Sequence, residues 1–308
     1  MMKSLVLGVL TAMAAGTMSG GRPDFRERPE VVRTGLSDSP ASLADSSVSC
    51  DQVSFTRNLR YGEFDQNILD VATVPSTDAD PRPVLLIVAG ETFTGDHGPA
   101  EANAGAMQDE AMCFAARHDM VGVRMSYRLA PAAPWPAGAR DVAAAASWIH
   151  QNIDLFGGNA QEIIAIGYAA GAFHVASFLA HREFQADDSD IAGAVLVSGI
   201  YQPSADGGDG ERAYFGTDAS KYEERSALPG LLSVQLPLML AWSATDPARL
   251  VTQGETLKRL LCNSVAHCPR TRVLKTRLTS GFGTDPADSD LAALTLELVQ
   301  EIEARGLP

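Results

Sequence analysis

Basic side chains are scarce in this sequence. Its 308 residues include 24 lysines and arginines against 38 aspartates and glutamates, which gives a formal net charge of −14 and a pI near 4.8. Proteins that bind nucleic acids need clustered basic residues to neutralise phosphates. The charge balance therefore argues against a nucleic-acid partner. An acidic surface favours solubility but does not indicate a fold.

Long hydrophobic runs are also missing from most of the chain. A helix that spans a bilayer needs about 20 consecutive apolar residues, and no stretch after residue 20 meets this requirement. We therefore expect a protein that is not membrane-spanning.

The first 20 residues have the pattern of a signal peptide. Lys3 supplies a positive start, residues 4–13 form a short apolar core, and Ala12-Met13-Ala14 provides a small-x-small cleavage pattern. The alternative interpretation is a disordered tail with a few apolar residues. Removal of residues 1–20 would leave 23 basic and 38 acidic residues, a net charge of −15. We expect export to the periplasm or the medium.

Metal-binding patterns are absent as well. The sequence has no C-x-x-C spacing and no cluster of histidine and cysteine, so we expect neither a metal nor a cofactor. Its four cysteines form an even set, which in an exported protein favours disulfides. Cys262 and Cys268 flank a short loop and are the expected pair, which leaves Cys50 with Cys113 by elimination. Four reduced, buried thiols are the alternative.

An alternation of strands and helices is present from about residue 49 onward. Residues 21–48 are polar and aperiodic, and we expect a flexible leader there. Residues 49–308 show no internal repeat or second-domain boundary, and the alternation predicts one α/β domain with a mostly parallel sheet. Residues 201–232 lack a strong period, and we interpret them as a cap-like insertion above the sheet. The expected strands are 53–59, 67–74, 83–89, 121–127, 162–166, 191–198, 236–242 and 273–277, and the expected helices are 102–117, 140–153, 170–179, 251–261 and 288–305.

A strand, a tight turn and a helix meet within residues 163–176. The segment Gly167-Tyr168-Ala169-Ala170-Gly171 has glycine at both glycine positions of the G-x-S-x-G nucleophile elbow, where the turn leaves no room for a Cβ atom. The central position is Ala169, which has no hydroxyl. Either a serine was replaced deliberately to trap a substrate, or the protein has lost hydrolase chemistry.

Further motifs follow one another in a recognisable order. They are Tyr61-Gly62 with Leu69-Asp70-Val71, Tyr127-Arg128-Leu129-Ala130-Pro131 with Pro134-Trp135-Pro136 and Asp141, Phe156-Gly157-Gly158-Asn159, and Asp246-Pro247. Together with the elbow, they resemble the α/β-hydrolase superfamily, in its carboxylesterase branch near the hormone-sensitive-lipase-like and feruloyl-esterase-like enzymes. The resemblance covers residue 53 to the C-terminus. It implies an α/β-hydrolase fold with helices flanking the sheet.

The resemblance also implies roles for individual residues. Ala169 occupies the nucleophile position and Asp246 the position of the triad acid. The oxyanion hole would be formed by Gly90, Glu91 and Ala170. Glu91 stands where the family has glycine, and its carboxylate would repel the developing negative charge if it faced the site. Alternatively, Glu91 points to solvent and has no effect.

The family histidine is missing from its expected place. The family carries it in the loop after the last strand, here residues 278–285, and this loop contains none. Of the six histidines, His97 lies in the loop on the oxyanion side and is the candidate for a substitute base. The nucleophile, the base and the oxyanion loop therefore all depart from the family pattern.

These departures lead to the hypothesis of an exported, carboxylesterase-like protein that is catalytically inactive and binds a small apolar or ester-like ligand. The alternative is a serine carboxylesterase for short-chain esters, represented here by a Ser-to-Ala form. Two other interpretations stay open. Glu91, Asp246 or Tyr168 could support unrelated acid–base chemistry, or the fold could be a structural scaffold whose pocket is filled by Phe93 or Tyr168.

Overall fold

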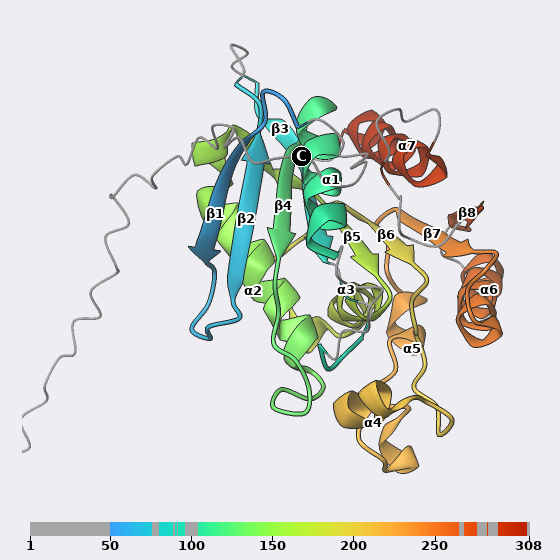
Figure 1. Ribbon diagram of the computed structural model, residues 1–308. Helices are drawn as coiled ribbons and strands as arrows, with labels where there is room; N and C mark the ends of the chain where they lie inside the picture. The colour runs from blue at the N-terminus through green and yellow to red at the C-terminus, as the bar shows by residue number, and fades with distance from the viewer. Residues whose placement is uncertain are drawn as a thin grey trace, which may run out of the picture. The chain divides into compact units, whose positions relative to one another are not determined.

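Eight strands form one sheet in the order β1-β2-β4-β3-β5-β6-β7-β8 (Figure 1). The computed structural model describes residues 50–75, 80–88, 90, 92–95, 104–264, 268–275, 282 and 289–306, all within one compact unit of residues 31–308. β2 pairs antiparallel with both β1 and β4, and every later pair is parallel. The strands are β1 (Ser54–Arg60), β2 (Ile68–Thr73), β3 (Arg82–Val88), β4 (Val121–Met125), β5 (Gly158–Tyr168), β6 (Gly193–Val197), β7 (Leu238–Ser243) and β8 (Arg270–Leu274).

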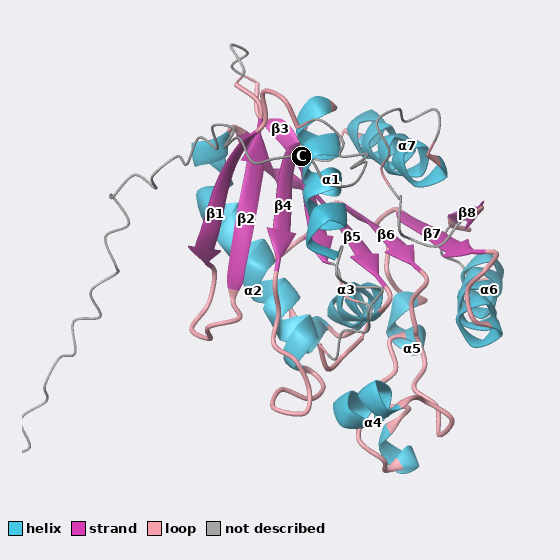
Figure 2. Ribbon diagram, viewed as in Figure 1, coloured by secondary structure: helices cyan, strands magenta, loops and turns pink. Residues whose placement is uncertain are grey.

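Helices cover both faces of this sheet (Figure 2). One face packs against α1 (Ala104–Arg117) and α7 (Asp290–Arg305), and the other against α2 (Ala137–Asn152), α3 (Ala170–Ala180) and α6 (Ala248–Asn263). The predicted α/β class with a mostly parallel sheet flanked by helices is confirmed. The predicted signal peptide (1–20) and leader (21–48) lie outside the described residues.

The central strand β3 explains why the sheet needs two layers of helices. Side chains alternate between the faces of a strand, and here both sets are apolar. Val84, Leu86 and Val88 belong to the core on the α2–α3 face, whereas Leu85 and Ile87 belong to the core on the α1–α7 face. A near-continuous apolar run is typical of a strand buried on both sides.

Several element boundaries differ from the sequence prediction by three or four residues: β5 begins at residue 158 rather than 162, and α6 at 248 rather than 251. β8 begins at Arg270 rather than at residue 273, directly after the Cys262–Cys268 disulfide closes the loop from α6. It is the last strand of the sheet order and only its final residue is buried, so the apolar pattern gave little guidance there. α2 begins at Ala137 rather than 140, because its first turn follows the Pro134–Pro136 segment.

Both expected disulfides are present. Cys50 pairs with Cys113, with 5.7 Å between their Cα atoms, and Cys262 pairs with Cys268, at 4.0 Å. The first joins the chain before β1 to α1, and the second joins the end of α6 to the segment before β8. The alternative of four reduced thiols is therefore wrong.

Residues 201–232 contain α4 (Asp209–Phe215), a short 3-10 helix (Ala219–Lys221) and α5 (Leu228–Leu231) between β6 and β7. In Figure 1 the arrowheads of β4, β5 and β6 point toward the side on which α4 and α5 lie. The segment therefore stands at the carboxyl ends of the parallel strands. Within the described ranges, no helix has the length and apolar character needed to cross a bilayer.

Candidate functional site

The turn between β5 and α3 has the geometry of a nucleophile elbow. Ala169 lies between the two elements with φ 47° and ψ −111°, and its N–H donates to the Val197 carbonyl at 2.9 Å. A positive φ is uncommon for a residue with a Cβ atom and costs about 1–3 kcal/mol. The Ala169 side chain, a methyl group, is partly exposed just beyond the carboxyl end of β5.

Gly167 makes this tight turn sterically feasible. A Cβ atom on Gly167 would lie 2.6 Å from the Ala172 Cα and 2.7 Å from the Gly171 carbonyl oxygen. The backbones of the strand end and of the helix start are thus in contact, which only glycine allows. Tyr168 follows on the strand.

The side chain of Tyr168 packs on the opposite face of the sheet from α3. It contacts the core cluster that contains Ala111 and Met112 of α1. Burial, together with the nearby Glu110 carboxylate, raises the pKa of Tyr168 well above its usual value. A phenol in this environment stays protonated, and it lies on the face of the sheet that packs against α1.

The elbow and the loop after β3 are joined by a backbone hydrogen bond. The Ala170 N–H donates to the Gly90 carbonyl oxygen at 2.9 Å. Gly90 has φ 155°, and a Cβ atom there would lie 1.7 Å from the Tyr127 hydroxyl oxygen, so this position also requires glycine. Gly90 and Ala170, both expected in the oxyanion hole, are therefore in contact, and one N–H group of that expected hole already has an acceptor. Glu91 and His97 lie outside the described residues.

Asp246 already has partners within the chain. It follows β7, and its Oδ2 accepts hydrogen bonds from the Ser198 hydroxyl at 2.6 Å and from the Ser243 N–H at 2.8 Å. Ser198 is buried, with φ 51°, at the end of β6. Sequence analysis missed both serines. The pattern that could have revealed them is their position at the carboxyl ends of neighbouring parallel strands, which meet at one edge of the sheet.

The histidines in the described part of the chain all have other neighbours. None of the four is hydrogen-bonded to Asp246. His174 on α3 is buried with its Nδ1 3.3 Å from the Tyr214 hydroxyl, and burial lowers its pKa to about 3. His118 contacts the Phe114 carbonyl and His150 contacts the Asp190 carbonyl. His181 lies beside the Glu183 carboxylate. His267 and most of the predicted histidine loop, residues 278–285, fall outside the described residues.

Aromatic side chains join the loop after β3 to the insertion. Phe93 stacks on Tyr214 of α4 with 4.7 Å between ring centroids, and its ring edges meet Phe173, His174 and Phe215. Phe93 is thus 4% exposed inside this cluster. The loop, α3 and α4 are consequently packed together as one unit beside the elbow.

Metal ligands do not gather at this site or elsewhere in the described ranges. Among those residues, no group of three or more histidine, cysteine, aspartate or glutamate side chains could hold a metal ion.

Comparison with known proteins identifies what this arrangement is similar to. Residues 65–215 match the family model described as the carboxylesterase family. A stretch of 115 residues, 37% of this chain, is 31% identical to esterase LipC of Mycobacterium tuberculosis and covers 27% of that protein. A stretch of 154 residues, 47% of this chain, is 27% identical to the probable carboxylic ester hydrolase LipM of the same organism and covers 34% of it. The matched region thus spans about a quarter to a third of these relatives.

Solved structures extend the similarity to most of the chain. An inhibited esterase B from Lactobacillus rhamnosis superposes with a TM-score of 0.68 at 14% sequence identity, and the match covers 83% of this chain and 89% of that one. At this identity the similarity concerns the fold.

Proposed function

We propose that this chain, whose residues 65–215 match the carboxylesterase family model, is an exported, non-catalytic carboxylesterase-like α/β-hydrolase that binds a small apolar or ester-like ligand. The ligand would occupy the place where an esterase holds its substrate, above Ala169. The observation that carries the proposal is the elbow itself, which keeps the esterase backbone but carries a methyl group.

Loss of the nucleophile removes most of the rate enhancement of a serine hydrolase. In such enzymes a serine attacks the ester carbonyl, a histidine accepts its proton and an acid orients the histidine. Ala169 cannot attack. Removing the serine typically lowers turnover by about a millionfold, and what remains comes from binding and the oxyanion hole.

Two other features support a loss of catalytic function at positions other than the nucleophile. The Ala170 N–H donates to Gly90 rather than pointing an unused donor at a substrate oxygen. The Asp246 Oδ2 accepts hydrogen bonds from Ser198 and Ser243, which supports a structural role for the residue at the position of the triad acid. Two features of the sequence agree with this loss of function: Glu91 stands in the oxyanion loop, and residues 278–285 contain no histidine.

Export is supported by the covalent structure. Disulfides persist in oxidising compartments and are rare in the cytosol of mesophiles, and this chain has two. The positively charged and then apolar start of the sequence agrees with a signal peptide.

Ligand binding above Ala169 can be tested by ligand-observed NMR with p-nitrophenyl butyrate as the probe. We expect saturation transfer to the unmodified protein and its loss in Ala169→Leu, whose side chain would fill the space above the elbow. Ala219→Leu places the same side chain on an exposed surface and serves as the control. Equal transfer to all three proteins, or none to the unmodified protein, would refute binding at this site.

A catalytic alternative is favoured by the strained backbone of Ala169. This conformation is the one in which the elbow presents a serine, and a Ser-to-Ala form of an active carboxylesterase would retain it. Restoring the serine distinguishes the two hypotheses, because only the second predicts that activity returns.

A further inference from the structure

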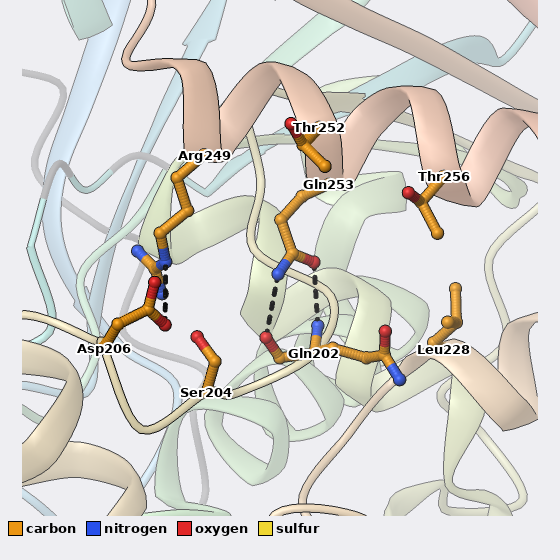
Figure 3. Close-up of a pocket in the computed structure, with 8 residues that line it drawn as sticks. All are labelled: Gln202, Ser204, Asp206, Leu228, Arg249, Thr252, Gln253 and Thr256. Carbon is orange, nitrogen blue, oxygen red and sulfur yellow. Dashed lines mark hydrogen bonds and ion pairs between the residues drawn. The ribbon is translucent and has the colours of Figure 1, made fainter.

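A polar cleft lies between α6 and the segment that follows β6 (Figure 3). Its volume is about 380 Å³, within the range of small-molecule sites. None of Ala169, Gly90 and Asp246 lines it. The cleft is lined by seven polar side chains and one leucine: Gln202, Ser204, Asp206, Leu228, Arg249, Thr252, Gln253 and Thr256.

One face of α6 supplies half of this lining. Residues at positions i, i+3, i+4 and i+7 share a face of a helix, and this spacing usually carries the apolar stripe that packs against the protein. On α6 the stripe toward the insertion is Arg249, Thr252, Gln253 and Thr256. The core contact of the helix is made by a different stripe, which includes Leu257. The polar stripe of α6 faces residues 202–206 across the cleft and does not fill it.

Hydrogen bonds hold both walls of the cleft in place. The Gln253 Oε1 accepts from the backbone N–H groups of Tyr201 and Gln202, each at 3.0 Å, and its Nε2 donates to the Gln202 carbonyl at 2.9 Å. Arg249 binds the carboxylate of Glu211 on α4 through both terminal nitrogens, one of them at 2.6 Å. The two walls are therefore held at a fixed spacing, which lowers the entropic cost of binding, and the exposed Gln202 side chain lies between them.

Polar groups remain available inside these walls. In Figure 3 the Gln202 side chain extends toward Leu228 beneath Thr256, whereas Arg249 and Asp206 lie at the other end of the cleft. Neither the side-chain amide of Gln202 nor the Thr256 hydroxyl has a hydrogen-bond partner among the described residues. The Arg249 Nε is buried without one, 3.9 Å from an Asp206 oxygen. An amide and a hydroxyl can each donate and accept.

The balance of charge restricts the kind of ligand. The one guanidinium of the cleft is neutralised by Glu211 and faces Asp206, so no positive charge is left for an anion. Leu228 adds an apolar contact that suits C–H groups. We propose that this cleft binds an uncharged polyhydroxyl compound, such as a monosaccharide or a small polyol.

The proposal predicts selective binding that depends on the unused polar groups. We would titrate D-xylose, D-glucose and glycerol into the full-length protein and follow its amide resonances by NMR, with acetate and tetramethylammonium as charged comparators. Gln202→Leu and Thr256→Val should each weaken binding of the neutral probes by about fivefold, which corresponds to one lost hydrogen bond. Gln161→Leu and Thr217→Val make the same changes at exposed positions outside the cleft and should have no effect.

Three results would overturn the proposal: no binding of any neutral probe, binding unaffected by Gln202→Leu and Thr256→Val, or preference for a charged comparator. The test is independent of the elbow. Ala169→Leu should leave polyol binding unchanged even though it blocks the site above Ala169.

Discussion

At the scale of single residues, the elbow keeps a backbone conformation that its present side chain does not use. Ala169 has φ 47°, a strained value for a residue with a Cβ atom. The turn depends on Gly167, whose Cα approaches the first turn of α3 so closely that no side chain fits. The steric requirement for glycine thus remains even though the hydroxyl is missing.

Gly167→Ala should therefore destabilise the protein. The added methyl group would lie 2.6 Å from the Ala172 Cα and would force the strand and the helix apart. We expect a loss of about 1–3 kcal/mol in the free energy of unfolding, measured by urea denaturation. Gly208→Ala is the matched control, because a methyl group there meets nothing within 4 Å. Its effect should stay below about 1 kcal/mol. Equal effects of the two changes would contradict the steric account.

His174 should make stability depend on pH. Burial lowers its pKa to about 3, whereas an unfolded histidine has a pKa near 6.5. Between these values the unfolded chain binds a proton that the folded protein does not. The contribution of His174 to the free energy of unfolding is therefore complete above about pH 6.5. It falls as the pH decreases toward 3, by up to about 1.4 kcal/mol per pH unit.

Urea unfolding between pH 7 and pH 4 tests this contribution. We expect His174→Asn to have a shallower pH dependence than the unmodified protein, by about one proton. His150→Asn, at a position where the ring reaches the surface and meets a backbone carbonyl, is the control and should keep the original slope. An unchanged slope in His174→Asn would rule out the buried neutral imidazole.

At the scale of elements, specific contacts attach α4 of the insertion to the loop after β3, to α2 and to α6. Tyr214 of α4 packs on Phe93 and its hydroxyl accepts from the Gly138 N–H at 3.2 Å. Arg249 of α6 binds Glu211 of α4, whose side chain is only 12% exposed. A charge left alone at this depth is costly, so the ion pair should help to fix α4.

Arg249→Met should loosen α4, because it leaves Glu211 buried without its partner. We expect a loss of about 1–3 kcal/mol in stability and faster proteolytic cleavage within residues 203–225. The double variant Arg249→Met, Glu211→Gln removes the unpaired charge and should recover part of the loss. A double variant as unstable as the single one would show that the ion pair does not hold the insertion.

Sequence analysis predicted the regular elements better than the contacts between them. Buried strands such as β3 and periodic helices such as α7 follow from local patterns of apolar residues. β8 was placed three residues too late because an exposed edge strand has a weak pattern.

The contacts at the site could not be predicted in the same way. The hydrogen bonds from Ser198 to Asp246 and from Ala170 to Gly90 join residues 48 and 80 positions apart. They depend on how neighbouring strands bring their ends together, which no local pattern specifies.

At the scale of the whole molecule, the two disulfides should contribute unequally to stability. A disulfide restricts the unfolded chain more when it closes a longer loop. The Cys50–Cys113 bridge spans 63 residues, whereas Cys262–Cys268 spans 6.

Replacing both cysteines of a pair by serine tests this difference. The loop-entropy relation predicts a loss of about 4 kcal/mol for the Cys50–Cys113 pair and about 2 kcal/mol for the Cys262–Cys268 pair. Urea denaturation of the two double variants gives both values. A larger loss for the short loop would mean that unfolded-chain entropy does not determine the contribution.

Hydrolysis of p-nitrophenyl acetate and butyrate tests whether catalysis is lost at the whole site or only at the nucleophile position. The assay compares the purified protein with Ala169→Ser and with Ala219→Ser, the same change on an exposed surface. If the loss extends to the base and the oxyanion hole, all three proteins should show no turnover above background. Rapid turnover by Ala169→Ser alone would mean that a working base is present, with His97 the first candidate, and would contradict the account of a dismantled triad.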